Sequence, residues 1–282
     1  MAMAVTEDGK QLRFRFKDKH GLFLPAAQPR ARCGDFEIVR VRKLKPIRAF
    51  IARNHYSGGN AQVTRAFELR GAQGRLVGGA TFGNVARTWV PPYGPASAWL
   101  CLNRFVLEDA VPMNGETLYL GECFAQLGKE GFLGVVSFSD PVPRSRRSGR
   151  VVFAGHYGAI YIAHNGVYTG RSKSETKLLL PNGNLYESRA ANKIKAGDQG
   201  HDYATEILRR AGARAMRKGE DPATWLAQAK AAVCRPFLHP GNFRYIWGLN
   251  KRVKKHLPAQ TEPYPKLVIP RASVGKPRST PK

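Results

Sequence analysis

One stretch of this chain restricts its fold more than any other, because a strand pattern, a helix pattern and a second strand pattern follow each other directly. Residues Leu100 to Glu108 alternate as a strand does, and residues 115–129 carry apolar side chains at helical spacing. Asn114 is the expected N-cap of that helix and Gly131 its end. The near-continuous apolar run from Leu133 to Asp140 is typical of a buried parallel strand. The sequence therefore predicts a right-handed crossover unit.

Further helix and strand patterns surround this unit. They comprise a helix over Leu44–Gly59, a hairpin over 66–83, an apolar segment over 159–162, a hairpin over Lys177–Glu187 and a helical pair over about 200–235. The first helix would bring Asn54 to Ser57 to its C-terminal end. The expected fold class is α/β (α+β), with a mixed central β-sheet flanked by helices.

The charge of the chain points to a polyanionic partner. Lys and Arg number 46 against 20 Asp and Glu, which gives a formal net charge of +26. Lysines and arginines that neutralise phosphates release condensed counterions, so such a chain is expected to bind nucleic acid in a salt-dependent manner. Charge alone does not distinguish DNA from RNA or from an anionic membrane surface. Because no signal-peptide pattern or apolar run of ~20 residues is present, we expect a soluble, cytoplasmic protein that does not enter a membrane.

Asp140 and His156 are the first candidates for chemistry. Asp140 follows a buried strand, and strand ends line the ligand crevice of open α/β sheets. The alternative is that Asp140 caps a local turn at Ser139-Asp140-Pro141. His156 follows a loop with four arginines that could bind phosphates and bring the imidazole near Asp140, although such a charge run can also be a solvated surface. These arginines are Arg144, Arg146, Arg147 and Arg150.

Two other groups of residues could take part in binding. The N-terminal turn of the helix that begins near Gly115 could bind a pyrophosphate, or Glu116 could simply complement the helix dipole. His, Asn and Tyr side chains elsewhere could stack on an extruded base and bond its edge, although each such residue is more often ordinary structure. They are His55, Tyr56, Ser57, Tyr161, His164, Asn165 and Tyr168.

An ordered set of segments, spread over about residues 40–266, resembles the Mom family of phage DNA-modification proteins, which belongs to the GNAT acyltransferase-like superfamily. The matching segments are Asn54–Ser57, Leu102–Val106, Pro112–Thr117, Val136–Pro141, Gly155–Tyr161, Tyr168–Gly170, Phe243–Trp247, Lys251–Leu257 and Pro263–Lys266. The resemblance implies a GNAT-like catalytic domain over residues 36–266. This chain departs from the family pattern in a helical insertion at about 190–235 and in a longer arginine-rich loop between Asp140 and Gly155. Residues 1–35 and 267–282 would be a basic N-terminal arm and a basic flexible C-terminal tail.

The activity that the resemblance implies is conversion of adenine in double-stranded phage DNA to an N6-methylcarbamoyl or related acyl form, which protects the DNA from host restriction. It also implies acetyl-CoA as cofactor and raises iron(II) as a second. The implied roles are catalysis by His55, Tyr56, Ser57, Asp140, His156 and Tyr161, with iron held by His55, Asp140 and His156. The implied cofactor-binding residues are Arg104, Asn114, Gly115, Glu116 and Thr117. Lys251, Arg252, Lys254 and Lys255 join the four loop arginines as nucleic-acid-binding candidates.

Two other functions are compatible with the sequence. The protein could be a GNAT-like N-acyltransferase that acts on another hypermodified base or on tRNA, or a non-catalytic basic protein that only binds nucleic acid. Simple acyl transfer requires a base for the attacking amine and donors for the thioester oxygen, and Asp140 or His156 could be that base. Because a methylcarbamoyl group contains one nitrogen more than an acetyl group, the residue types leave the reaction open.

Overall fold

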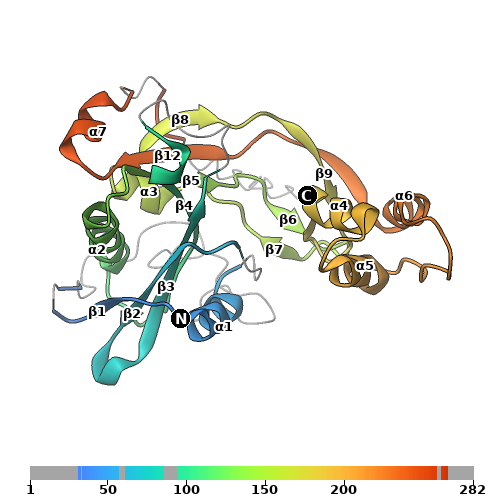
Figure 1. Ribbon diagram of the computed structural model, residues 1–282, viewed down its shortest axis with the longest axis horizontal. Helices are drawn as coiled ribbons and strands as arrows, with labels where there is room; N and C mark the ends of the chain where they lie inside the picture. Colours follow the sequence, from blue (N-terminus) through green and yellow to red (C-terminus); the bar gives the residue numbers. More distant parts are fainter. Residues whose placement is uncertain (1–30, 33, 57–60, 86–93, 259–261, 266–282) are drawn as a thin grey trace, which may run out of the picture.

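The computed structural model describes residues 31–32, 34–56, 61–85, 94–258 and 262–265 (Figure 1). The strands are β1 (Glu37–Arg40), β2 (Arg65–Arg70), β3 (Leu76–Asn84), β4 (Trp99–Leu107), β5 (Gly134–Ser139), β6 (Arg144–Ser145), β7 (Val151–Phe153), β8 (Val167–Arg171), β9 (Glu175–Leu179), β10 (Leu185–Tyr186), β11 (Arg235–His239) and β12 (Phe243–Gly248). The α-helices are α1 (Leu44–Asn54), α2 (Gly115–Lys129), α3 (Ala159–Ala163), α4 (Ser188–Ala196), α5 (His201–Arg210), α6 (Pro222–Val233) and α7 (Lys251–His256). No helix within these residues is long and apolar enough to cross a membrane.

A seven-stranded mixed sheet forms the centre of the molecule. Its strand order is β1-β2-β3-β4-β5-β12-β8, and β4 and β5 are its parallel pair. The other neighbouring strands of this sheet run antiparallel, as the expected mixed sheet requires. The chain reaches β5 from β4 through α2, so the strand-helix-strand unit predicted from the sequence is confirmed.

Helices cover both faces of this sheet. The apolar stripe of α1 packs against Ala66 of β2 and Val106 of β4. Phe67 and Leu69 point to the opposite face, because successive residues of a strand alternate, and they share a core with α2. Val253 of α7 packs beneath β5 and β12 on the side away from α2. The expected sheet flanked by helices is therefore confirmed.

The residues that flank helix α2 are Asn114 at its start and Gly131 after its end. Gly131 adopts a φ of 90° just after the helix, where a left-handed residue ends it as expected. Asn114 occupies the N-cap position, but its φ is 71° and its side chain makes no capping bond to the helix backbone. The Asn114 side chain instead accepts a hydrogen bond from the hydroxyl of Thr117, so the expected N-cap position is confirmed without a side-chain bond to the helix backbone.

The parallel strands β4 and β5 separate near the middle of the sheet. Their last paired residues are Leu102 and Ser137, although β4 continues to Leu107 and β5 to Ser139. One step along β3, from Thr81 to Phe82, spans two steps along β4, from Arg104 to Leu102. Asn103 is thus the extra residue of a β-bulge, which redirects the strand and its side chains at this point. The bulge and the end of pairing together open a gap between β4 and β5.

The chain between β8 and β12 forms a separate lobe, which lies to the right in Figure 1, away from α2 and α7. It contains a three-stranded sheet of order β10-β9-β11 and the helices α4, α5 and α6 around their own apolar core, which includes Ile194, Leu208 and Trp225. The two ends of the lobe meet, because the N–H of Ser172 donates to the carbonyl of Asn242 and the N–H of Asn242 donates to the Ser172 hydroxyl, both at 2.8 Å.

Several expected elements are present with altered bounds or partners. The hairpin over 66–83 is confirmed as β2 and β3, whereas the first helix ends at Asn54 rather than at Gly59, because His55 is already extended. The hairpin over Lys177–Glu187 exists as β9 and β10, but it belongs to the lobe and not to the central sheet. The expected helical pair becomes α5 and α6, preceded by α4, and the apolar segment over 159–162 is helix α3. The expected arm over 1–35, apart from 31–32 and 34–35, and the tail lie outside the described residues.

Candidate active site

A tyrosine and a histidine from distant parts of the chain meet at the end of α1. The residue after α1, His55, is buried, and Tyr56 follows it. The Tyr56 hydroxyl oxygen lies 3.2 Å from Nε2 of His156, which comes from the loop between β7 and α3. The Tyr56 ring also stacks on Phe153, with 4.5 Å between the ring centroids and 29° between the ring planes. Tyr56 is therefore held by a hydrogen bond on one side and an aromatic ring on the other.

Burial keeps both members of this pair uncharged. It raises the pKa of the Tyr56 phenol well above its ordinary value, and it lowers the pKa of His156 to about 4. A neutral imidazole and a protonated phenol are thus present together at neutral pH. The Tyr56 hydroxyl can donate a hydrogen bond to Nε2 of His156, and this bond would set the orientation of the imidazole ring.

Arg104 and Tyr161 lie beside this pair at the gap between β4 and β5. Burial lowers the pKa of the Arg104 guanidinium, and Tyr56 and Tyr161 both lie near enough to act on that charge. Tyr161 comes from α3 and makes a side-chain hydrogen bond with Ser137, one of the last paired residues of β5. Its ring centroid lies 6.2 Å from that of His156. Burial raises the pKa of the Tyr161 phenol, which therefore keeps its proton.

Asp140 is engaged by several groups just beyond the end of β5. Its Oδ1 accepts the N–H of Val142 at 2.9 Å and lies 3.0 Å from Nε2 of His239, while its Oδ2 pairs with the Arg144 guanidinium. The arginine lowers the pKa of this carboxyl against the opposing effect of burial. The local-turn alternative for Asp140 is therefore correct in geometry. Asp140 bonds His156 through its backbone carbonyl, which accepts the His156 N–H at 2.7 Å.

His239 is a site residue that the sequence reasoning missed. It ends β11, is 2% exposed, and its Nδ1 accepts the N–H of Gly241 at 3.1 Å. Since Nδ1 is an acceptor, Nε2 carries the proton that binds Asp140. Asp140 and His239 lie 99 positions apart, and no motif around His239 marks it in the sequence. The lobe thus reaches the site through one buried histidine.

Arg144 connects the Asp140 group to the Tyr56 group. Its guanidinium carbon lies 4.1 Å from the centroid of the Phe153 ring, the same ring that stacks on Tyr56. The Arg144 side chain is only 11% exposed and is paired with Asp140. The structure therefore places Arg144 inside the protein, and a contact between this arginine and nucleic acid stays a prediction.

The other basic candidates lie on the surface or close to it. Arg147 and Arg150 are exposed and Arg146 is half-buried in the turn between β6 and β7, where the N–H of Arg146 donates to the carbonyl of Arg150 at 2.7 Å. The exposed residues of α7 form a second basic surface, which consists of Lys251, Arg252, Lys254 and Lys255. Figure 1 places α7 at the opposite end of the molecule from the lobe.

The candidate cofactor residues fall at two places. Arg104 lies with Tyr56 and Tyr161, whereas Asn114 to Thr117 form the first turn of α2. The N–H of Gly115 is already used by the carbonyl of Pro112, and Glu116 adds an acidic group to that turn. Four of the five expected cofactor residues therefore lie at the helix terminus, and Arg104 lies at the gap between the strands.

The expected iron site does not assemble in the described part of the chain. Those residues contain no group of three or more His, Cys, Asp and Glu side chains that could hold a metal ion. Both oxygens of Asp140 are occupied by protein partners, and Nε2 of His156 faces the Tyr56 hydroxyl. The centroids of the His55 and Tyr56 rings lie 4.2 Å apart. Ser57 lies outside the described residues.

Comparison with known proteins identifies the family. The sequence model of the Mom protein family matches residues 35–266, which is most of the chain. The chain belongs to the Mom protein family. This match confirms the resemblance inferred from the sequence. The mixed sheet flanked by helices confirms the expected α/β (α+β) fold class.

Solved structures similar to this Mom-family chain include three GNAT proteins. An Escherichia coli GNAT family N-acetyltransferase in complex with CoA has 14% identity and a TM-score of 0.30, over 39% of this chain and 66% of that one. A tandem GNAT protein of the clavulanic acid biosynthesis pathway has 9% identity and a TM-score of 0.39, over 76% and 99%. A Staphylococcus aureus N-acetyltransferase has 13% identity and a TM-score of 0.31, over 51% and 88%. No curated protein matches the sequence significantly.

Proposed function

We propose that the protein modifies N6 of adenine in double-stranded phage DNA and so protects the DNA from host restriction. Transfer from an acyl thioester gives an N6-acyl base, whereas an N6-methylcarbamoyl base requires a donor that supplies one further nitrogen. The observation that carries this proposal is the group of Tyr56, His156, Tyr161 and Arg104 at the gap between β4 and β5. Family membership supports the choice of a DNA-modifying reaction. The net charge of +26 supports a nucleic-acid acceptor.

The gap suits an extended acyl-CoA donor. After Leu102, no strand among the described residues pairs with the side of β4 that faces β5. The backbone N–H and C=O groups of β4 on that side therefore point into the gap. Arg104 adds a cation there. When bound, acyl-CoA supplies an acyl group activated as a thioester. Arg104 and the backbone of β4 would hold it, with Tyr161 at the inner end of the gap.

The residues around the gap have protonation states suited to this transfer. Neutral His156 can take the Tyr56 hydroxyl proton at Nε2 while the Tyr56 oxygen takes the proton of the attacking amine, so that the pair acts together as the proton acceptor. Tyr56 orients the imidazole through its hydroxyl. Tyr161 keeps its proton and can donate a hydrogen bond to the departing sulfur, while Arg104 stabilises negative charge that develops nearby. Asp140 acts through Arg144 and Phe153 as support for Tyr56.

Access of an adenine base to these groups requires that the base leave the duplex, since N6 takes part in base pairing. The rings of Tyr56 and Tyr161 both lie beside His156, and they are the aromatic groups that such a base would meet. The exposed arginines of the β6–β7 turn and the basic surface of α7 would bind the DNA backbone. Cytoplasm of a phage-infected or lysogenic bacterium is the expected place of action.

Mass spectrometry of nucleosides tests this function. DNA and RNA from bacteria that express the wild-type protein, His156→Ala or His201→Ala are digested and compared. We expect a modified adenosine in DNA with wild type and with His201→Ala, which changes a partly exposed histidine of α5 that is not among the candidate site residues. His156→Ala should reduce its yield by about 10²–10⁴-fold if the imidazole is the proton acceptor. The mass of the product separates an acyl from a methylcarbamoyl group.

Other results of the same experiment would overturn the proposal. A modified base only in tRNA, or only on a base other than adenine, would identify a different acceptor. Equal yields with wild type and His156→Ala would exclude His156 from the reaction. If no nucleoside changes while the purified protein still binds DNA, the protein only binds nucleic acid.

A further inference from the structure

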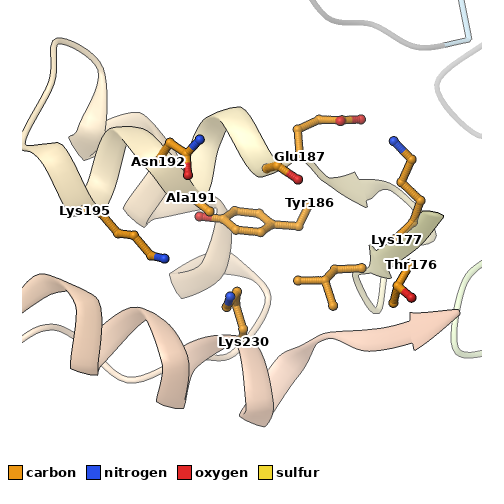
Figure 2. Close-up of a pocket in the computed structure, with 10 residues that line it drawn as sticks. Thr176, Lys177, Tyr186, Glu187, Ala191, Asn192, Lys195 and Lys230 are labelled. Atoms are coloured by element: carbon orange, nitrogen blue, oxygen red, sulfur yellow. The ribbon is translucent and has the colours of Figure 1, made fainter.

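A hollow in the lobe carries basic groups that the proposed reaction does not use. It has a volume of about 230 Å³ and lies between β9, β10, α4 and α6. Figure 2 shows Lys195 of α4 and Lys230 of α6 directed into the space below the Tyr186 ring, while Lys177 of β9 lies at its other end. Ser188 and Asn192 supply further polar groups to its wall. We call this feature the lysine hollow.

The charges of the lysine hollow are unbalanced. Lys177 pairs with Glu175 at 2.8 Å, but in the region that the structure describes no carboxylate pairs with Lys195 or Lys230. Glu187 is the acidic residue that lines the hollow, against three lysines. Like charges that share one concave space repel each other, and a bound anion removes that repulsion. The ammonium, hydroxyl and amide groups present are donors that suit phosphate oxygens.

The lysine hollow lies near the candidate active site. In the sheet of the lobe, Glu175 of β9 pairs with His239 of β11, and Lys177, which lines the hollow, lies two residues further along β9. His239 at the end of β11 joins the same lobe to Asp140. A strand whose base occupies the space beside Arg104 and Tyr56 would therefore pass next to the lobe.

We propose that the lysine hollow binds a backbone phosphate of the DNA strand that delivers its base to the active site. This inference rests on the proposed function for its substrate. The lobe would then bind the modified strand close to the reacting base, whereas the basic surface of α7 binds the duplex further away. Phosphate contacts of this kind fix the register of the protein on DNA.

The test measures DNA binding by fluorescence anisotropy at several salt concentrations. Lys195→Gln/Lys230→Gln removes the two unpaired charges, and Lys129→Gln/Lys218→Gln removes two exposed charges elsewhere as a matched control. We expect the first variant to bind a short adenine-containing duplex about tenfold more weakly, with a salt slope shallower by about 0.9 because one phosphate is no longer neutralised. The control should keep the wild-type slope. Identical behaviour of the two double variants would overturn the proposal.

A second ligand separates two sources of phosphate. Binding of CoA is measured with the same variants, and we expect Lys195→Gln/Lys230→Gln to leave it unchanged. Loss of CoA affinity with unchanged DNA affinity would assign the lysine hollow to the cofactor and reject the DNA assignment. Neither measurement needs turnover, so a failure of the proposed function, seen as unmodified nucleosides despite DNA binding, is distinct from a failure of this inference.

Discussion

Asp140 accepts hydrogen bonds from its own loop and from His239, which belongs to the lobe. The acceptor role of Nδ1 toward Gly241 means that the imidazole can serve Asp140 only through Nε2–H. The orientation of His239 is therefore set on both sides. Buried His239 therefore stabilises the fold through its bond to Asp140. It also restricts where Asp140 lies, and so where Arg144, the other partner of Asp140, can lie.

Replacement of His239 should reveal this role. His239→Ala removes one hydrogen bond to a partly buried carboxylate, and we expect the free energy of unfolding to fall by about 1–3 kcal/mol. His239→Gln retains a donor on a side chain of similar reach and should be less destabilised. Urea denaturation of both variants gives the comparison. Equal destabilisation of the two variants would mean that packing, and not the bond to Asp140, determines the contribution of His239.

The low pKa of His156 predicts a stability that depends on pH. The ordinary pKa is 6.5 and the folded value is about 4, so between these values the unfolded chain binds a proton that the folded chain does not. The free energy of unfolding should therefore fall as the pH drops from about 6.5 to about 4. Urea denaturation across this range measures the slope. His156→Gln should make the slope shallower, whereas a slope unchanged by that substitution would contradict the assignment.

The sequence allowed part of this site to be predicted, for physical reasons. Tyr56 follows a helix whose apolar stripe is visible in the sequence, so its place near the end of that helix could be inferred from periodicity, whereas His156 was singled out by the arginine-rich loop before it. Arg104 was predicted only as a cofactor-binding residue, and its place beside Tyr56 and Tyr161 was not predicted. Strand periodicity does not reveal that Asn103 forms a bulge next to it. His239 lies in a strand of the lobe, and no local sequence pattern shows that this strand ends next to β5.

At the scale of elements, local sequence patterns predicted helices and strands reliably, but they did not predict which strands pair with each other. The β4-α2-β5 unit follows from local hydrophobic periodicity, and it is present. The β9–β10 hairpin also follows from its turn residues, but its sheet was wrong because the alternation of side chains shows which face is buried and not which strand lies alongside. Short strands such as β8 and β12 carry too few residues for a clear period.

Helix α7 offers a test at this scale. The side chain of Asn250 accepts the N–H of Val253 at 2.8 Å, which caps a short helix that carries four exposed basic residues. Asn250→Ala should lower the free energy of unfolding by about 1 kcal/mol, and Asn250→Ser, which keeps an acceptor, by less. Chemical denaturation measures both. If the two variants are equally stable, the cap contributes nothing to α7.

The whole molecule combines an excess of 26 positive charges with one seven-stranded mixed sheet. Residues 267–282, which lie outside the described part, add Arg271, Lys276, Arg278 and Lys282. Deletion of residues 267–282 should weaken DNA binding and make its salt slope shallower by up to about 3.6, at about 0.9 for each phosphate that these side chains neutralise. Anisotropy titrations at several salt concentrations measure this slope. A truncated protein that binds equally well at every salt concentration would contradict the prediction.

The bonds between Ser172 and Asn242 close the lobe at its base. Because β8 and β12 are antiparallel neighbours, the lobe occupies the position of a hairpin turn in the central sheet. Its length and sequence can change without altering the strand pairing on which the sheet depends. We therefore expect that the segment from Ser172 to Asn242 can be exchanged without loss of the central sheet, provided that the histidine that bonds Asp140 is retained.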